Sequence, residues 1–202
     1  MKRFAILGYP LGHTLSPKLH RLLAEQLGEQ IEYSICAIPP EELEEHFEEL
    51  FCLDGFNITI PYKVRLMEQL DRLDTSARNH GAVNVVSIAA DGKRCGYNTD
   101  CIGFVRTMQS HGVPIAGRVC VLGAGGVGRM FATECALRGC TVTLAVRAAS
   151  MEAAEQVAAH LRSLDAQAKV EVMDIERLDG SQAYELMINA TPVGMYPNVQ
   201  HS

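Results

Sequence analysis

The sequence predicts a two-domain α/β protein, with an N-terminal α/β domain followed by a Rossmann-like domain built on a doubly wound parallel sheet. Short apolar strands alternate with amphipathic helices along the 202 residues, a pattern typical of strand-helix-strand units. One of these strands runs directly into Gly123-x-Gly125-x-x-Gly128, which begins a helix. Residues 112–117 contain glycine and proline and separate the first half of the chain from the strand that enters the glycine-rich turn. We therefore expect one domain at residues 1–112 and a second at residues 113–202.

Caps, chain breakers and apolar periodicity place the elements of the first half. Ser16-Pro17 is a typical helix start, because Ser is a favoured N-cap and Pro fits the first helical position. Residues 41–50 carry six glutamates, but Leu43, Phe47 and Leu50 share one face, so we read a helix with a solvated acidic face. The expected strands are residues 3–7, 31–38, 56–60, 83–89 and 94–97, and the expected helices are residues 16–27, 41–50, 61–70 and 101–111. Asp91-Gly92 is the expected turn between the last two strands.

The glycine-rich turn of the second half predicts a dinucleotide site. In this motif the first glycine permits a tight turn, the second lets the backbone approach a pyrophosphate, and the third allows the helix to pack close to the strand. The helix N-terminus then favours phosphate. The alternative is a glycine-rich helix start that binds nothing. The remaining elements expected here are strands 118–122, 141–146, 169–173 and 185–189, and helices that follow the turn to residue 138 and span 150–164.

The end of the next strand bears on which dinucleotide binds. NAD sites tend to place Asp or Glu about 20 residues after the glycine turn, where it holds the ribose 2′-hydroxyl. Here the strand ends at Val146-Arg147, without an acid. Arg147 is suited to a 2′-phosphate, which favours NADP over NAD. The alternative is a surface arginine at a strand end.

Composition excludes several classes of function. The formal net charge is −6 and the isoelectric point is about 5.6, so there is no basic surplus to bind nucleic acid. The seven cysteines lack CxxC and zinc-finger spacing, which indicates reduced, small apolar residues and no metal site. No apolar run approaches the roughly 18–20 residues that span a bilayer. We expect a cytoplasmic protein that binds neither nucleic acid nor membrane.

Two residues of the first half have side chains suited to proton transfer. Lys63 falls in the first turn of the expected helix 61–70. A cation there opposes the helix macrodipole, which eases release of its proton. The alternative is an exposed lysine. Asp100 is the second candidate, and its alternative role is that of a helix N-cap.

Four further side chains are candidates for binding a polar ligand. Asn57 and Thr59 stand at alternate positions of an apolar strand, so they share one face. Thr14 and Ser16 lie at a helix N-terminus, where hydroxyls and free N–H groups suit a carboxylate. Ser16 is alternatively no more than the cap of that helix.

Six segments match the motifs of one known family in order and spacing. They are residues 8–17 (GYPLGHTLSP), 55–63 (GFNITIPYK), 81–85 (GAVNV), 98–103 (NTDCIG), 123–126 (GAGG) and 189–195 (NATPVGM). They are similar to the motifs GxPxxHSxSP, GxNVTxPxK, GAVNT and NTDxxG, the cofactor turn, and the NATxxGM loop of the shikimate dehydrogenases. The chain therefore resembles this family, including its quinate/shikimate relatives, from one end to the other.

The resemblance implies reversible, NADP-linked reduction of 3-dehydroshikimate to shikimate, on the route to chorismate and the aromatic amino acids. It implies that Lys63 and Asp100 form the catalytic pair. The substrate-binding residues that it implies are Thr14, Ser16, Asn57, Thr59, Asn84, Thr99 and Asp100. The cofactor-binding residues that it implies are Gly123, Ala124, Gly125, Gly126, Val127, Arg147, Ala190, Thr191 and Val193. We expect a monomer or a homodimer acting on a small molecule.

The chain departs from the family pattern at three places. Thr14 stands where Ser is usual, and its methyl group crowds the carboxylate site. The loop at residues 146–151 keeps Arg147 but lacks the second arginine of the family's NRTxxR, so use of NAD stays open. Family members continue past position 202 with further strands and helices, so we expect an incomplete second domain and weak turnover from these residues alone. The alternatives are an NAD-linked quinate/shikimate dehydrogenase and a non-catalytic remnant.

Overall fold

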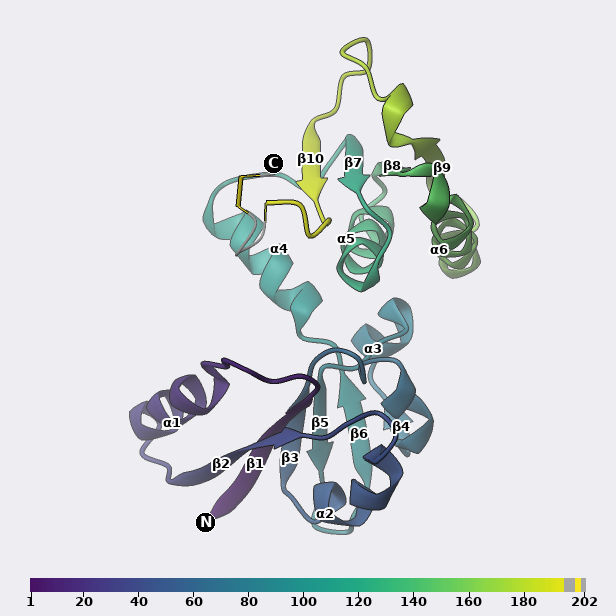
Figure 1. Cartoon of the computed structure of the whole chain (residues 1–202). Coiled ribbons are helices and arrows are strands. Elements are labelled where there is room, and N and C mark those ends of the chain that lie inside the picture. Colours follow the sequence, from purple (N-terminus) through teal and green to yellow (C-terminus); the bar gives the residue numbers. More distant parts are fainter. Residues whose placement is uncertain (195–198, 201–202) are drawn as a thin grey trace. The chain divides into compact units, whose positions relative to one another are not determined.

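The computed structural model describes residues 1–194 and 199–200 and divides into two compact units, Met1–Thr99 and Asp100–Ser202 (Figure 1). The division falls before helix α4 (Asp100–Ser110), whereas the sequence placed a boundary near residues 112–117. The two domains expected at residues 1–112 and 113–202, which the family resemblance assigns to substrate and to NADP respectively, stay a prediction. Within the described residues no helix has both the length and the apolar character needed to cross a membrane.

The first unit is built on a mixed sheet with strand order β2-β1-β3-β5-β6-β4. The pairs β1–β2, β1–β3 and β4–β6 are parallel, whereas β3–β5 and β5–β6 are antiparallel. The hairpin turn at Asp91-Gly92 is confirmed, because the Ala89 N–H donates to the carbonyl of Lys93 across it at 2.9 Å. The strands are β1 (Lys2–Gly8), β2 (Ile31–Ala37), β3 (Gly55–Ile58), β4 (Arg72–Leu73), β5 (Val85–Ile88) and β6 (Arg94–Tyr97).

The two faces of this sheet have different environments. One face carries the main core of the unit, with Ala5, Leu7, Phe56, Ile58 and Val86 buried against Leu43, Leu50 and Leu66. Residues of β1 alternate between the faces, so Phe4 and Ile6 lie on the other one. Helix α1 (Ser16–Gln26) covers that second face, where the ring of its His20 stacks on Tyr33 of β2.

Two predicted helices of the first unit need correction. The helix expected over residues 41–50 is a 3₁₀ turn, η1 (Leu43–His46), followed by a short helix, α2 (Phe47–Phe51). The helix expected over residues 61–70 is wrong, since only a 3₁₀ turn, η2 (Arg65–Gln69), forms there. The cause is a long-range contact: the carbonyl of Lys63 accepts a hydrogen bond from Val83 N at 2.7 Å instead of from the next turn of a helix.

Helix starts and stops account for two further differences. Ser16 is the first residue of α1 rather than its N-cap, and its N–H donates to Thr14 Oγ1 at 3.2 Å. Helix α3 (Thr75–His80) was not predicted, although its caps follow the usual chemistry. Asp74 accepts a hydrogen bond from Ser76 N at 2.8 Å, and Gly81 ends the helix in the left-handed conformation.

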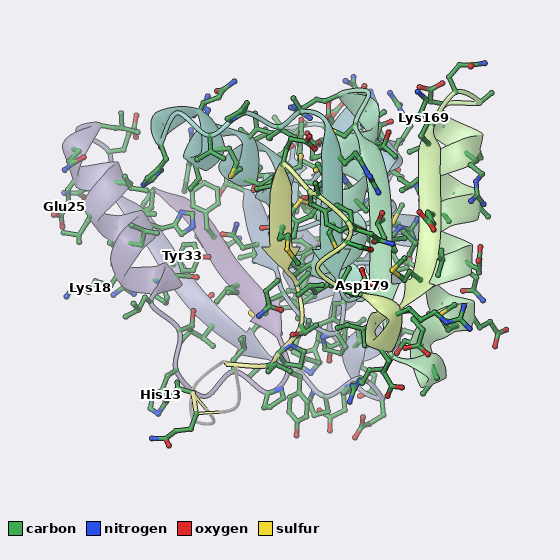
Figure 2. All side chains as sticks on the ribbon, turned by 90° about the horizontal axis from the view of Figure 1, so that it is seen from above. His13, Lys18, Glu25, Tyr33, Lys169 and Asp179 are labelled. Atoms are coloured by element: carbon green, nitrogen blue, oxygen red, sulfur yellow. The ribbon has the colours of Figure 1, made fainter. Side chains whose placement is uncertain are left out.

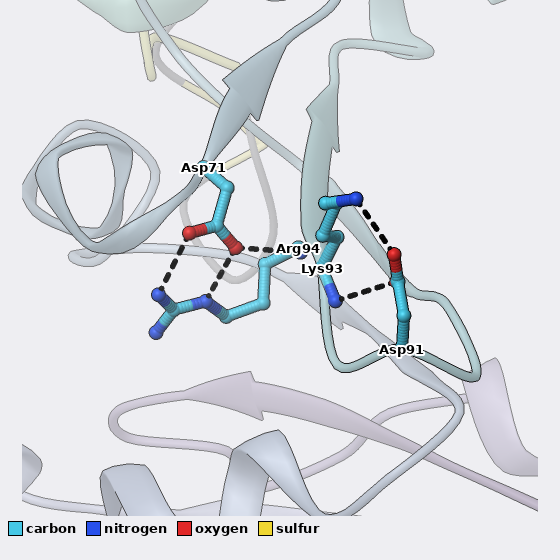
Figure 3. Close-up of polar contacts among 4 residues, drawn as sticks. All are labelled: Asp71, Asp91, Lys93 and Arg94. Atoms are coloured by element: carbon cyan, nitrogen blue, oxygen red, sulfur yellow. Dashed lines mark hydrogen bonds and ion pairs between the residues drawn. The ribbon is translucent and has the colours of Figure 1, made fainter.

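An ion pair joins the segment before β4 to β6 (Figure 3). Arg94 Nε and Nη2 donate to the two carboxylate oxygens of Asp71 at 3.0 and 3.1 Å, and Arg94 N donates to the same group at 2.8 Å. These contacts lower the pKa of Asp71 to about 2. Lys93 and Asp91 form a second pair at the hairpin turn.

The second unit contains a parallel sheet with strand order β10-β7-β8-β9. Its core is formed by inward residues of β7 and β8, namely Val119, Val121, Val142 and Leu144, packed against helices α5 and α6. The chain adds β8 and β9 on one side of β7 and then returns to place β10 on the other, so the order reverses between β7 and β10. Bounds are β7 (Arg118–Leu122), α5 (Gly126–Leu137), β8 (Thr141–Val146), η3 (Ala148–Ser150), α6 (Met151–Leu164), β9 (Lys169–Asp174), η4 (Ile175–Arg177) and β10 (Leu186–Asn189).

The seven cysteines all lie in the described part of the chain and are free thiols. Those of the second unit are buried, and burial raises the pKa of the Cys135 thiol to about 12. This environment agrees with their expected use as small apolar residues.

Candidate active site

The glycine turn after β7 has the geometry that the sequence predicted. Gly123 adopts a φ of +96°, which an L side chain rarely tolerates. A Cβ on Gly128 would lie 2.1 Å from the carbonyl oxygen of Gly123, so only glycine allows α5 to approach the strand this closely. A Cβ on Gly125 would meet no described atom within 4 Å, so the backbone there is open to a ligand. The tight turn at Gly123 and the close packing at Gly128 are confirmed, whereas the approach of a pyrophosphate to Gly125 stays a prediction.

The N-terminus of α5 is suited to an anion. Gly125 occupies the cap position, and no described side chain caps the first turn or places an acid in it. The unsatisfied N–H groups and the positive end of the helix dipole therefore face the open side of the turn. A pyrophosphate fits this cradle both in charge and in the space that the missing Cβ atoms leave.

A pocket of about 460 Å³ opens at the same edge of the sheet. The segments after β7, β8, β9 and β10 all contribute to it, as expected for a ligand site at the carboxyl ends of parallel strands where the strand order reverses. The predicted residues that line it are Gly123, Ala124, Gly125, Arg147, Ala190, Thr191 and Val193. Gly126 and Val127 lie instead in the first turn of α5 and do not line the pocket.

Seven further residues line this pocket and were not predicted: Leu122, Ala145, Val146, Ser150, Ile175, Asn189 and Pro192. Most of them lie at strand ends, so the rule that ligands bind there gives a signal for them. Ile175, in η4 after β9, carried no motif that would have singled it out.

Asn189 orders the loop that follows β10. Its Oδ1 accepts hydrogen bonds from Thr191 N at 3.0 Å and Thr191 Oγ1 at 2.6 Å, and its Nδ2 donates to the carbonyl of Val193 at 3.2 Å. These bonds hold the pocket side of the loop in one conformation. Met195, the last residue of the NATxxGM-like segment, lies outside the described residues.

Arg147 is exposed where β8 ends, and the residues flanking it, Val146 and Ala148, are apolar. It lines the pocket, and its role in binding a cofactor stays a prediction. The position normally taken by a ribose-binding acid thus holds a cation, which is suited to a phosphate rather than a hydroxyl.

In the first unit, Thr59, Asn84 and Thr99 come together at one edge of the sheet. Thr59 follows β3 and donates its N–H to Leu7 at 2.8 Å, whereas the carbonyl of Asn84, before β5, accepts from Ile58 N at 2.8 Å. Asn84 Oδ1 accepts from Thr99 N at 2.8 Å and from Thr99 Oγ1 at 3.2 Å. These contacts fix the orientation of the Asn84 amide, which is 8% exposed.

Lys63 is half-buried in the loop between β3 and η2. The Val83 N–H donates to the carbonyl of Lys63, which places Lys63 beside the segment that leads into β5. The helix-macrodipole argument for Lys63 is wrong, because the residue precedes a 3₁₀ turn rather than opening an α-helix. Asp100 is the exposed first residue of α4, in the second unit. The pairing of Lys63 with Asp100 stays a prediction.

The hydroxyls of Thr14 and Ser16 are paired, with Thr14 Oγ1 donating to Ser16 Oγ at 3.2 Å. Asn57, on β3, is half-buried, and its Oδ1 accepts a hydrogen bond from the hydroxyl of Tyr33 at 2.6 Å. A larger pocket of about 780 Å³ between α1 and the sheet shares Asn57 and Thr99 with the predicted substrate residues.

Comparison with known proteins finds a family model for each unit and relatives that match nearly the whole chain. Residues 6–86 match the family model of the shikimate dehydrogenase substrate binding domain, and residues 119–193 match that of ketopantoate reductase PanE/ApbA. The shikimate dehydrogenase (NADP(+)) of Bacillus cereus strain B4264 is 36% identical over 98% of this chain, which covers 72% of that protein.

Solved structures of shikimate 5-dehydrogenases resemble the chain as a whole. The enzyme of Thermus thermophilus in complex with NADP(H) and shikimate matches 96% of this chain and 70% of its own, with 33% identity and a TM-score of 0.82. The enzyme of Listeria monocytogenes in complex with shikimate and NAD matches 100% of this chain and 72% of its own, with 28% identity and a TM-score of 0.89. The open glycine cradle, the lysine beside a polar sheet edge and these similarities agree, and the chain belongs to the shikimate dehydrogenase family.

Proposed function

We propose that this chain catalyses the reversible, NADP-linked reduction of 3-dehydroshikimate to shikimate, a step toward chorismate and the aromatic amino acids. The observation that carries the proposal is the edge of the first sheet, where Lys63, Thr59 and Asn84 lie on segments joined by backbone hydrogen bonds. A proton donor and side chains that bind hydroxyl groups are thus held on one rigid framework. Such an arrangement suits a polyol substrate that carries a ketone.

The chemistry of ketone reduction explains the need for Lys63. NADPH, when bound at the glycine cradle, supplies the hydride that adds to the carbonyl carbon. Negative charge then builds on the carbonyl oxygen, and we assign Lys63 Nζ as the donor of the proton to that oxygen. In the reverse direction the neutral amine accepts the proton from the shikimate hydroxyl. Asp100 is the second member of the proposed catalytic pair.

Substrate binding is assigned to the remaining polar residues of the first unit. The paired hydroxyls of Thr14 and Ser16 suit the carboxylate, and Asn57, Thr59, Asn84 and Thr99 suit the ring hydroxyls. A site that offers several fixed donors and acceptors rejects analogues that lack the matching hydroxyl, because its own polar groups would then be left unpaired. The seven free thiols support a cytoplasmic location for this activity.

Turnover of the purified chain tests the proposal. Shikimate or quinate is supplied with NADP or NAD, and formation of reduced nicotinamide is followed by absorbance. We expect the largest kcat/KM with shikimate and NADP. Lys63→Ala should lower kcat by about 100-fold or more, the usual contribution of a general acid.

Lys93→Ala is the matched control, because Lys93 is an exposed lysine of the same unit at the hairpin turn. It should leave kcat within about twofold of wild type. Full activity of Lys63→Ala would refute the assignment of Lys63. Silence in every combination would refute the proposed activity and favour the non-catalytic alternative.

An NAD-linked quinate/shikimate dehydrogenase is the second candidate. It is favoured by the loop at residues 146–151, in which Arg147 is the one cation. A kcat/KM larger with NAD than with NADP, or larger with quinate than with shikimate, would select it.

A further inference from the structure

Tyr33 lies beneath helix α1 and contacts Asn57, one of the predicted substrate residues. It lies on β2, is 2% exposed, and stacks on His20 of α1 with ring centroids 4.6 Å apart and an interplanar angle of 15°. Figure 2 shows Tyr33 beside this helix, which also carries Lys18 and Glu25. The Tyr33 ring is therefore held between the sheet and helix α1.

The hydroxyl of Tyr33 reaches across one strand to Asn57. Tyr33 pairs with Phe4 of β1, and Asn57 pairs with Ile6 of the same strand. Because Phe4 and Ile6 are two residues apart, Tyr33 and Asn57 lie on the same face of the sheet. The 2.6 Å bond from the Tyr33 hydroxyl to Asn57 Oδ1 thus bridges β2 and β3, which do not pair directly.

This bond determines which end of the Asn57 amide serves a ligand. Burial raises the pKa of Tyr33 to about 12, so the phenol keeps its proton over the whole pH range of enzyme assays. Tyr33 therefore always donates to Asn57 Oδ1. The Nδ2 group of Asn57 points away from Tyr33 and is the end of the amide that can donate to a ligand.

We propose that Tyr33 is a positioning residue for substrate binding, which orients the Asn57 amide. The inference rests on the proposed function, since it treats Asn57 as a ligand of shikimate. Tyr33 acts through Asn57, and His20 holds its ring in place. Its role is to fix hydrogen-bonding groups before the substrate arrives, which lowers the cost of ordering them on binding.

Tyr33→Phe tests the inference, because it keeps the ring stacked on His20 and removes only the hydroxyl. Shikimate affinity is measured by calorimetry and shikimate KM by turnover, with NADP affinity and the thermal unfolding transition recorded for every variant. We expect the Kd and KM for shikimate to rise about fivefold, the size of one lost hydrogen bond. The value of kcat and the Kd for NADP should stay within about twofold of wild type.

A double-mutant cycle separates positioning from a general loss of structure. If Tyr33 acts through Asn57, then Tyr33→Phe made in an Asn57→Ala background should change shikimate affinity by less than about 1.5-fold. Ser34→Ala is the matched control, since it removes a hydroxyl from the next residue of β2, on the opposite face of the sheet. It should leave shikimate affinity unchanged.

Each outcome bears on a different claim. Wild-type affinity in a folded Tyr33→Phe variant would overturn the inference and leave the proposed function intact. An equal loss in the wild-type and Asn57→Ala backgrounds would also overturn it, because the effect would not pass through Asn57. A wild-type chain that neither binds nor oxidises shikimate would overturn the proposed function, and the inference with it.

Discussion

Replacement of Gly128 by alanine tests the close contact between α5 and the glycine turn. The added Cβ would lie 2.1 Å from the Gly123 carbonyl oxygen and must move out to the 3.4 Å of ordinary contact, an opening of about 1.3 Å. The opposing atoms belong to the backbone of Gly123, so no flexible side chain can yield in their place. We therefore expect the start of α5 to move away from β7.

The cost of this movement follows from two opposing contributions. Overpacking against a rigid neighbour costs about 3 kcal/mol at the upper end of its usual range. Alanine is favoured over glycine inside a helix by about 1 kcal/mol, which offsets part of that cost. The net loss of about 2 kcal/mol lowers the Tm of the second unit by about 8 °C or more at the usual sensitivity of a domain of this size.

The same movement weakens cofactor binding. The N–H groups at the start of α5 would no longer meet the phosphates at hydrogen-bond distance, so we expect the Kd for NADP to rise at least tenfold, equivalent to about 1.4 kcal/mol. Differential scanning calorimetry and titration calorimetry measure the two effects. Gly180→Ala is the control, since its Cβ would meet no described atom within 4 Å. A Gly128→Ala protein that melts and binds NADP like wild type would refute the reasoning.

Two further predictions concern charged residues. Arg147→Ala should raise the Kd for NADP about tenfold and leave the Kd for NAD within twofold, because the two cofactors differ by the 2′-phosphate that Arg147 is suited to contact; equal changes for both cofactors would contradict this role. Hydrogen bonds from Arg94 hold the pKa of Asp71 at about 2, below its unfolded value of about 3.9. The stabilisation is therefore complete above about pH 4 and is lost as the pH falls through about 2. In urea unfolding across this range, Asp71→Asn should show a weaker decline in the free energy of unfolding than wild type, and parallel profiles would exclude the ion pair as the cause.

Two strands with strong local patterns were predicted to the residue. The strands at residues 118–122 and 141–146 match β7 and β8, because the first lies between two glycines and the second is a run of β-branched and apolar residues that ends before Arg147. The helix expected over residues 61–70 failed because a contact 20 residues away in sequence decided the conformation. The carbonyl of Lys63 bonds to Val83, and apolar spacing carries no information about such a partner. Strand β4, with two residues, is too short to show any period.

The candidate site was predictable where the backbone dictates the residue type. Gly123 is required by its positive φ, and Gly128 by its close approach to the Gly123 carbonyl. The GxGxxG spacing marks both positions in the sequence. Ile175 lines the pocket at the glycine turn because the chain turns there after β9, and its place in the sequence gives no sign of this. The sequence of β2 likewise gives no sign that its one aromatic hydroxyl, that of Tyr33, reaches a polar residue of β3.

Both candidate sites lie where strands of a sheet end. At the carboxyl end of a strand the ladder of hydrogen bonds stops, and the next backbone groups must find side chains or ligands as partners. In the second unit the ends of β7, β8, β9 and β10 meet there because the strands are parallel. In the first unit the antiparallel strand β5 starts where β3 and β6 end, which brings Asn84 to the same edge as Thr59 and Thr99. The mixed sheet thus gathers side chains from strand starts as well as strand ends, and this is why its site is rich in fixed polar groups, whereas the parallel sheet offers mainly backbone N–H groups to a phosphate.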